Sequence, residues 1–403
     1  MDVVRTNADF RLLWLAQTVS LIGSQITFLA IPIVAAVTLH ASPLEMSVLV
    51  ATEALPALFF GLLVGTLVDR SPKRPALISA DLVRAGVLML IPIAWLAGFL
   101  SLPLLLAVAF IDGLAALIFD SANQALLPQL LDGERLIAGN SALEVSRSAG
   151  ELIGPTMAGG LIQLLKAPVA LAVDAWSYLA SAALLLRISH REARHLNPTG
   201  ESVVRGMREG LATIIQSRSI RTLAFCIAAF GITNAMTEAI VLLYLIREVG
   251  MTPSLLGVVF GAGSLGFLVG AILPERIVTR IGIGPALAGS LLLIGCGDLF
   301  IPFATHSMLV AAILVGFGVG LAWRGPDPVG FGQFLFGIGL TLYNVTQTTL
   351  RQSLVPGRLA GRTASTLRAM GWGLAPAGAL LGGLLAEFFG MRQTLVVAAL
   401  LEG

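Results

Sequence analysis

The stretch Gly65-Thr-Leu-Val-Asp69-Arg70-Ser-Pro-Lys73-Arg74 joins two long apolar runs, residues 44–68 and 75–98. It gathers four charged side chains, three of them cationic, into a few residues. Loops rich in lysine and arginine stay on the cytoplasmic side of a membrane, because they resist translocation. A loop that only sets the orientation of the chain needs no acidic residue. Here, however, Asp69 stands four residues after Gly65, and a glycine allows another helix to approach closely. The stretch therefore predicts two membrane-spanning helices joined by a cytoplasmic turn, with a role for the turn beyond topology.

The composition of the whole chain is typical of an integral membrane protein. Of its 403 residues 56% are hydrophobic and 12% are charged, whereas soluble domains carry about 25% charged residues. The net charge of +2 does not indicate nucleic-acid binding. Cys226 and Cys296 lie in apolar runs and the four histidines fall in predicted loops, so we expect no disulfide framework, metal site or cofactor.

Apolar runs long enough to cross a bilayer cover nearly the whole chain. The predicted spans are 10–38, 44–68, 75–98, 102–130, 140–165, 168–187, 220–246, 254–276, 284–304, one crossing within 308–350, 364–389 and a short tail from 392. With a cytoplasmic N-terminus, eighteen arginine and lysine residues fall in cytoplasmic loops and four fall outside. Positive charges concentrate in cytoplasmic loops, so this asymmetry sets the orientation.

The long polar connector after the sixth span divides the chain into two halves. We expect an N-terminal six-helix bundle at 1–187, a cytoplasmic linker at 188–219 with an amphipathic helix at 201–216, and a C-terminal bundle at 220–403. The C-terminal bundle is expected to contain an extra segment at about 305–328, re-entrant or at the outer surface, and a truncated or distorted last helix.

Short matches between the halves indicate an internal repeat. Offsets of 205, 210, 223 and 221 residues align the second to fifth spans with the eighth to eleventh. The matched segments are Gly61-Leu-Leu-Val-Gly65 with Gly266-Phe-Leu-Val-Gly270, Ile91-Pro92 with Ile301-Pro302, Gln124 with Gln347, and Arg147 with Arg368. Each match alone is weak, and together they predict two six-helix bundles related by pseudo-two-fold symmetry.

The charged turn resembles the loop between helices 2 and 3 of the major facilitator superfamily, Gly-x-Leu-x-Asp-Arg-x-x-Arg/Lys-Arg. The resemblance assigns a conformational latch to Gly65, Asp69, Arg70, Lys73 and Arg74. Pro72 stands where many members have glycine. The resemblance implies an all-α membrane protein with the twelve-helix fold of that family, and transport by rocking of two bundles about a site at the membrane midplane.

The fifth predicted span contains Gly150-Glu-Leu-Ile-Gly154-Pro155-Thr-Met-Ala158-Gly159-Gly160. It resembles the antiporter motif of drug and proton exchangers, which favours export over uptake. The alternative is a tight structural helix crossing, because small residues four apart allow two helices to pack closely. Glu151 within this stretch is either a functional carboxylate or a partner in a hydrogen bond between helices.

Polar side chains at helical spacing occur on the first, fourth, seventh and tenth spans, the four that line the central cavity in this family. The candidates for the substrate cavity are Gln17, Gln25, Asn123, Asn234, Asn344 and Gln347. A carboxylate within the membrane is costly, so it should face a cavity or a partner. The candidates for proton coupling are Glu53, expected to be buried, together with Asp120 and Glu238; Asp174 and Asp298 are predicted to make structural polar contacts.

Three further stretches resemble the bacterial branch that contains macrolide-efflux and enterobactin-export proteins. They are Asn7-Ala-Asp-Phe10-Arg11, Asp81-Leu-Val-Arg84 and Ala122-Asn-Gln-Ala-Leu-Leu-Pro128. No phosphate-binding Gly-x-x-x-x-Gly-Lys-Ser/Thr loop occurs, so an ion gradient must supply the energy.

We expect a proton-coupled exporter of amphiphilic small molecules, a monomer in the bacterial inner membrane and not an enzyme. The alternatives are a metabolite or siderophore exporter, a nutrient facilitator, or a non-transporting sensor of the same fold.

Overall fold

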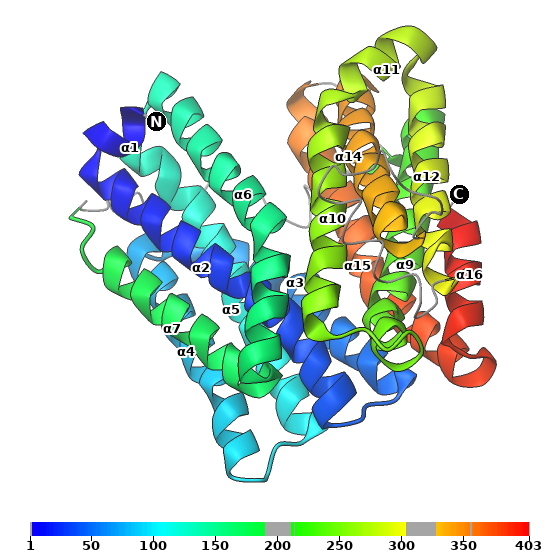
Figure 1. Cartoon of the computed structure of the whole chain (residues 1–403). Coiled ribbons are helices and arrows are strands. Elements are labelled where there is room, and N and C mark those ends of the chain that lie inside the picture. The colour runs from blue at the N-terminus through cyan, green and yellow to red at the C-terminus, as the bar shows by residue number, and fades with distance from the viewer. Residues whose placement is uncertain (1, 190–210, 213, 304–327, 355–356, 403) are drawn as a thin grey trace, which may run out of the picture. The chain divides into compact units, whose positions relative to one another are not determined.

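The computed structural model describes residues 2–189, 211–212, 214–303, 328–354 and 357–402, and within these residues it contains helices and no strand (Figure 1). Contacts divide the chain into two compact units. Unit 1 comprises Met1–His40 and Leu55–Thr199, and unit 2 comprises Ala41–Ala54 and Gly200–Gly403. Residues 41–54 thus group with the second unit, whereas the domain limits expected from the sequence place them in the first bundle; those limits remain a prediction.

Unit 1 contains six long helices and a short one at the N-terminus. Their bounds are α1 Asp2–Thr6, α2 Ala8–Ile33 with a π-helical continuation Val34–Thr38, α3 Pro43–Arg70 (whose first part belongs to unit 2), α4 Lys73–Leu96, α5 Leu102–Leu130, α6 Gly133–Leu165 and α7 Ala167–Leu185. Helix α7 packs against α2 and α4, α4 packs also against α5, and α2 packs against α6 (Figure 1).

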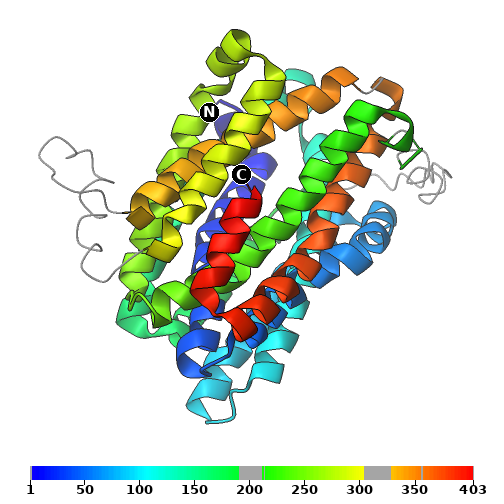
Figure 2. The same cartoon turned by 90° about the vertical axis from the view of Figure 1, so that its right-hand side faces the viewer.

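Unit 2 repeats this pattern of packing. Its helices are α9 Arg218–Arg247, α10 Pro253–Ile272, α11 Pro274–Ile281, α12 Ile283–Leu299, a 3-10 turn Ile301–Phe303, α14 Pro328–Leu354, α15 Gly357–Phe389 and α16 Met391–Glu402. Helix α16 lies against α9 and α12, α12 packs against α14, and α9 packs against α15 (Figure 2). The pairs α9/α15 and α12/α14 correspond to α2/α6 and α4/α5 of unit 1, as the internal repeat predicts.

The observed helices confirm the predicted membrane spans to within a few residues, apart from earlier starts of α6 and α15. Among the described residues, eight helices are long and apolar enough to cross a membrane by length and composition. The last described helix, α16, comprises the 12 residues Met391–Glu402. The expected extra segment at 305–328 and most of the expected amphipathic helix at 201–216 lie outside the described residues.

Polar contacts fix the beginning of α2 within unit 1. The Asn7 side chain accepts a hydrogen bond from the Phe10 amide at 2.9 Å, which caps the helix, and donates one to the Leu130 carbonyl at 3.1 Å at the end of α5. The Asp9 carboxylate accepts a hydrogen bond from the Ser189 amide at 2.8 Å, just beyond α7. Phe10 itself is fully buried. The stretch from Asn7 to Phe10 therefore ties together the ends of three helices.

Glycines let the helices of unit 2 approach one another closely. A Cβ atom added at Gly297 of α12 would lie 2.6 Å from the Gly332 carbonyl oxygen and 2.8 Å from the Phe336 amide nitrogen, both on α14. Gly266 and Gly270 of α10 likewise face the α14 backbone. Such close backbone approach is typical of membrane helices, where apolar side chains gain nothing by leaving lipid and packing must come from contact.

We predict that Gly297→Ala destabilises the protein, because the added methyl group must push α12 away from α14. Overpacking of this kind costs about 1–3 kcal/mol. The matched control is Gly289→Ala on the same helix, where no described atom lies within 4 Å of the added methyl group. The control should be neutral or slightly stabilising, since alanine favours the helix by up to about 1 kcal/mol. Thermal unfolding of both variants in detergent checks this, and equal midpoints would contradict the close approach of α12 and α14.

Candidate functional site

The charged turn between α3 and α4 caps the C-terminal end of α3. The Lys73 ammonium group is buried and donates hydrogen bonds to the Val68 carbonyl at 2.5 Å and the Ser71 carbonyl at 2.8 Å. The Ser71 hydroxyl donates to the Leu67 carbonyl at 2.7 Å. The last carbonyls of a helix lack partners within the helix and carry partial negative charge, so a cation there is stabilising.

Arg74 caps the C-terminal end of α7 in the same way. Its guanidinium Nε donates to the Leu185 carbonyl at 3.0 Å, and its Nη2 donates to the Leu186 carbonyl. This contact within unit 1 was not expected from the sequence, where the family resemblance assigned Arg74 to a conformational latch. Arg70 is exposed, and the side chain of Asp69 lies outside what the structure describes. The latch role of the turn therefore remains a prediction.

Gly65 does not support the expected helix approach within the described residues, because a Cβ atom added there would meet no described atom within 4 Å. Its repeat counterpart, Gly270, is packed: an added Cβ atom would lie 2.9 Å from both the Ile338 carbonyl oxygen and the Thr341 Cβ. The two halves therefore use these matching glycines differently.

The glycine-rich stretch of α6 packs against α2. A Cβ atom added at Gly150 would collide with the Leu21 side chain, and one at Gly154 would lie 2.8 Å from the Gln25 Cβ. Pro155 and Gly159 are buried. A Cβ atom added at Gly160 would meet no described atom within 4 Å. The first two glycines thus form the tight crossing that the structural alternative predicts, and an antiporter role of the stretch remains a prediction.

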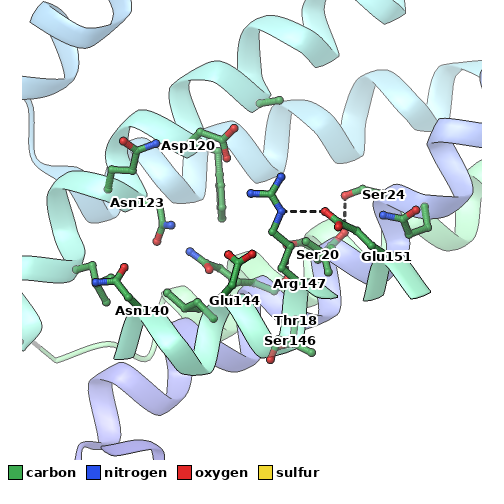
Figure 3. Close-up of a pocket in the computed structure, with 18 of the residues that line it drawn as sticks. Thr18, Ser20, Ser24, Asp120, Asn123, Asn140, Glu144, Ser146, Arg147 and Glu151 are labelled. Carbon is green, nitrogen blue, oxygen red and sulfur yellow. Dashed lines mark hydrogen bonds and ion pairs between the residues drawn. The ribbon is translucent and has the colours of Figure 1, made fainter. Parts of the chain in front are cut away.

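A pocket of about 640 Å³ lies within unit 1, walled mainly by α2, α5 and α6 (Figure 3). Its polar and charged lining residues are Gln17, Thr18, Ser20, Ser24, Gln25, Arg84, Asp120, Asn123, Gln124, Asn140, Glu144, Ser146, Arg147 and Glu151. Apolar side chains, among them Leu21 and Phe119, complete the wall. A volume in the range of about 300–1,000 Å³ is typical of small-molecule sites.

The pocket contains four of the residues predicted from the sequence. Gln17 and Gln25 come from α2. Asp120 and Asn123 come from α5 (Figure 3). Helix α6 adds Asn140, Glu144, Arg147 and Glu151 to the pocket. Of these, the sequence suggested a functional role only for Glu151, as one of two alternatives, and the other three were not predicted. The spacings between the four, of four, three and four residues, place them on one helix face. That spacing is the signal that could have identified them.

An ion pair lies in the α6 wall of the pocket. The Arg147 Nε and the Glu151 Oε1 are 2.9 Å apart, one helical turn from each other (Figure 3). Both side chains are substantially exposed, 63% and 43%. Exposed pairs of this spacing contribute only about 0.3–0.5 kcal/mol to stability. The pair therefore can separate at low cost when a charged molecule enters the pocket.

The other predicted residues lie in unit 2. Asn234 and Glu238 are on α9, and Asn344 and Gln347 are on α14. Helices α9 and α14 meet where the Phe230 and Tyr343 rings pack with centroids 4.8 Å apart.

Glu53 is exposed on α3, which corrects the expectation that it is buried. Its predicted role in proton coupling is untested. Cys226 and Cys296 are reduced, and no cluster of three or more metal-ligating side chains occurs among the described residues.

Residues 13–326 match the model of the Major Facilitator Superfamily. Three curated relatives are similar over most of their lengths. The chain is 26% identical to the uncharacterized MFS-type transporter YfiS of Bacillus subtilis (96% of this chain, 88% of the relative) and 26% identical to the multidrug efflux pump Tap of Mycolicibacterium fortuitum (94% and 89%). It is 23% identical to macrolide efflux protein A of Streptococcus pyogenes (97% and 93%).

Among solved structures, the nucleoside transporter NupG has a similar fold. The TM-score is 0.80 at 10% sequence identity, with 98% of this chain and 97% of the other covered. At this identity the likeness concerns the fold alone.

We predict that Arg74→Gln lowers the stability of unit 1, because two terminal carbonyls of α7 lose a charged donor. Hydrogen bonds to charged groups contribute about 1.5–3 kcal/mol when buried, and partial exposure of this site reduces the expected loss to about 1 kcal/mol. Arg70→Gln, a few residues away at an exposed position, is the control and should change little. Thermal unfolding in detergent measures both, and an equal loss in the two variants would argue against the cap.

Proposed function

Because this chain belongs to the Major Facilitator Superfamily of multi-pass membrane transporters, we propose that it exports amphiphilic small molecules in exchange for protons. The observation that carries the proposal is the pocket of unit 1, which combines polar groups from three helices with an apolar wall. The pocket is large enough for a drug-sized molecule or a substantial part of one.

The charges in the pocket favour a substrate with a basic group. Two arginines, Arg84 and Arg147, face three acids, Asp120, Glu144 and Glu151. The acids outnumber the cations, and Arg147 already pairs with Glu151. A protonated amine on an otherwise apolar molecule would find a carboxylate and apolar contacts in the same pocket. Relatives named as multidrug and macrolide efflux proteins support export of such molecules.

Proton coupling requires a carboxylate that can exchange its proton on both sides of the membrane. Asp120 on the pocket wall fits this requirement, and Glu238 on α9 is the candidate in unit 2. The proposed cycle is alternating access, in which the two bundles rock about the substrate site. The turn from Gly65 to Arg74 would act as the latch of this motion, and the protein would work as a monomer in the bacterial inner membrane.

We predict that inverted membrane vesicles containing the chain accumulate a cationic dye and a macrolide, and that a protonophore abolishes this accumulation. Asp120→Asn should reduce the accumulation, because it removes both a titratable group and a negative charge from the pocket wall. Asp132→Asn, the same change at an exposed position before α6, should not. Accumulation that persists in the presence of the protonophore would overturn proton coupling. Flux in the opposite direction would favour a nutrient facilitator.

The orientation of the chain is tested by labelling single cysteines in a background with Cys226 and Cys296 replaced by alanine. With a cytoplasmic N-terminus, Ser101→Cys before α5 lies outside and Arg135→Cys at the start of α6 lies inside. Both positions are exposed. An impermeant maleimide should therefore label only Ser101→Cys in intact cells, and the reverse pattern would invert the topology.

A further inference from the structure

A second group of charged side chains lies inside unit 1, behind the pocket. Arg84, halfway along α4, forms a two-pronged ion pair with Asp112 of α5: Nε lies 3.0 Å from Oδ1, and Nη2 lies 3.2 Å from Oδ2. The guanidinium also stacks on the ring of Tyr178 of α7, with the Arg84 Cζ 4.1 Å from the ring centroid. The structure places Arg84 at mid-helix, with two partners.

A third helix brings in a second carboxylate. Asp174 of α7 is fully buried and accepts hydrogen bonds from the Thr27 hydroxyl of α2 and the Ser177 hydroxyl at 2.8 Å. A Cβ atom added at Gly23 of α2 would collide with Asp174 and Ser177, so the glycine admits the carboxylate between the helices. Two hydroxyl donors stabilise a carboxylate, but they bring no positive charge.

Asp81 is the third carboxylate, three residues before Arg84 on α4. It is 0% exposed, and neither of its oxygens has a hydrogen-bond partner among the described residues. The Ser181 hydroxyl of α7 lies beside it and is also buried without a formed hydrogen bond. A buried ionised carboxylate without a donor is among the costliest arrangements in a protein, whereas a protonated carboxyl group is uncharged and can itself donate.

The charges of this group do not balance. The group contains three buried carboxyl groups, those of Asp81, Asp112 and Asp174, but one guanidinium, that of Arg84, which pairs with Asp112. Helix α2 contributes only hydroxyl groups, those of Ser24 and Thr27. Asp120, the remaining acid near Arg84, lies on the pocket side. An unpaired carboxylate within a membrane is energetically costly. Protons on Asp81 and Asp174 remove this cost.

The second half of the chain shows that the helix packing does not require these charges. At the repeat offsets of 210 and 223 residues, Arg84 and Asp112 correspond to Ile294 of α12 and Leu335 of α14. Ile294 is fully buried where α12 packs against α14. At these two positions the helix crossing of unit 2 has apolar side chains in place of the ion pair. Helix packing alone therefore does not explain the charged cluster of unit 1, which consists of Arg84, Asp81, Asp112 and Asp174.

Two side chains, Arg84 and Ser24, connect the cluster to the pocket. Arg84 pairs with Asp112 and also lines the pocket. Ser24 lines the pocket too, and its hydroxyl lies 3.1 Å from the Tyr178 hydroxyl, whose ring stacks on Arg84. A change of charge in the cluster can therefore alter the pocket wall, and a cationic substrate in the pocket can repel Arg84.

From this arrangement we infer that Asp81 and Asp174, in addition to Asp120 on the pocket wall, bind protons that are exchanged for substrate, and that Arg84 is the positioning residue that links them to the pocket. The inference rests on the proposed function for its role in export, whereas proton binding itself can be tested separately. When a proton leaves Asp81, the ionised carboxylate competes with Asp112 for Arg84, one turn away. The guanidinium then shifts, and with it the wall of the substrate pocket. No bond other than that to the proton forms or breaks.

Infrared difference spectroscopy of the purified chain tests the proton site without any transport. The unmutated protein, titrated from acid to alkaline pH, should lose the carbonyl band of a buried protonated carboxyl group. Asp81→Asn and Asp174→Asn should each remove part of this band, and the exposed control Asp132→Asn should leave it intact. Arg84→Gln should make the band persist to higher pH, because a cation that favours ionisation is lost, and Arg84→Lys should restore much of the normal titration. Absence of the band from the unmutated protein would overturn the inference whether or not the variants fold.

Transport then separates this inference from the proposed function. In proteoliposomes, Asp81→Asn should lose accumulation driven by a proton gradient while retaining exchange of labelled for unlabelled substrate across the membrane, since exchange needs no proton step. Proton-driven export that survives in both aspartate variants, with an unchanged infrared band, would overturn the cluster and leave export standing. A band that Asp81→Asn removes in a chain without proton-driven flux would support the proton site and refute the export proposal.

Discussion

The structure depends on one constraint, which is that polar groups within a membrane find no water. Each backbone amide and carbonyl must be satisfied inside its own segment, so the spans are helices. The same constraint acts at helix ends, where Lys73, Ser71 and Arg74 donate to the carbonyls that close α3 and α7. It acts on side chains too, because each buried charge must find a partner, face a cavity or lose its charge.

Close packing follows from the same environment. Lipid solvates apolar side chains as well as another helix does, so helices associate by fitting together. Gly150 and Gly154 bring α6 against α2, and Gly297 with Gly332 brings α12 against α14. The contact between α6 and α2 also shapes the pocket of unit 1, because Gln25, which meets Gly154, lines it. A packing motif and a candidate binding surface therefore share residues, which explains why a glycine-rich stretch can appear both structural and functional.

The charged side chains of unit 1 form two layers around Arg84. On the pocket side lie Asp120 and Arg147, accessible to a substrate. Behind Arg84 lie Asp112, Tyr178 and the two acids Asp81 and Asp174, closed off from solvent. An arginine suits this position because its planar guanidinium can pair with a carboxylate and stack on an aromatic ring together, which a lysine cannot do equally well. At the repeat offset of 210 residues unit 2 has Ile294 in place of Arg84, so the two halves differ at this position.

The sequence by itself determined the order of the described apolar helices, most of their limits to within a few residues, and the family, because each of these depends on local composition and period. It also identified Gln17, Gln25, Asp120 and Asn123, whose spacing places polar groups on one face of a helix. Only the tertiary structure decided that Arg74 caps α7, that Gly65 is open while Gly270 is packed, and that Asp81, Asp112 and Asp174 from three helices surround one arginine. The reason is that the spacing of residues within one segment does not indicate which residues of another helix they will contact. Asp174 in the sequence is one acid in an apolar run, and it becomes part of a charged cluster only when α2, α4 and α7 pack together.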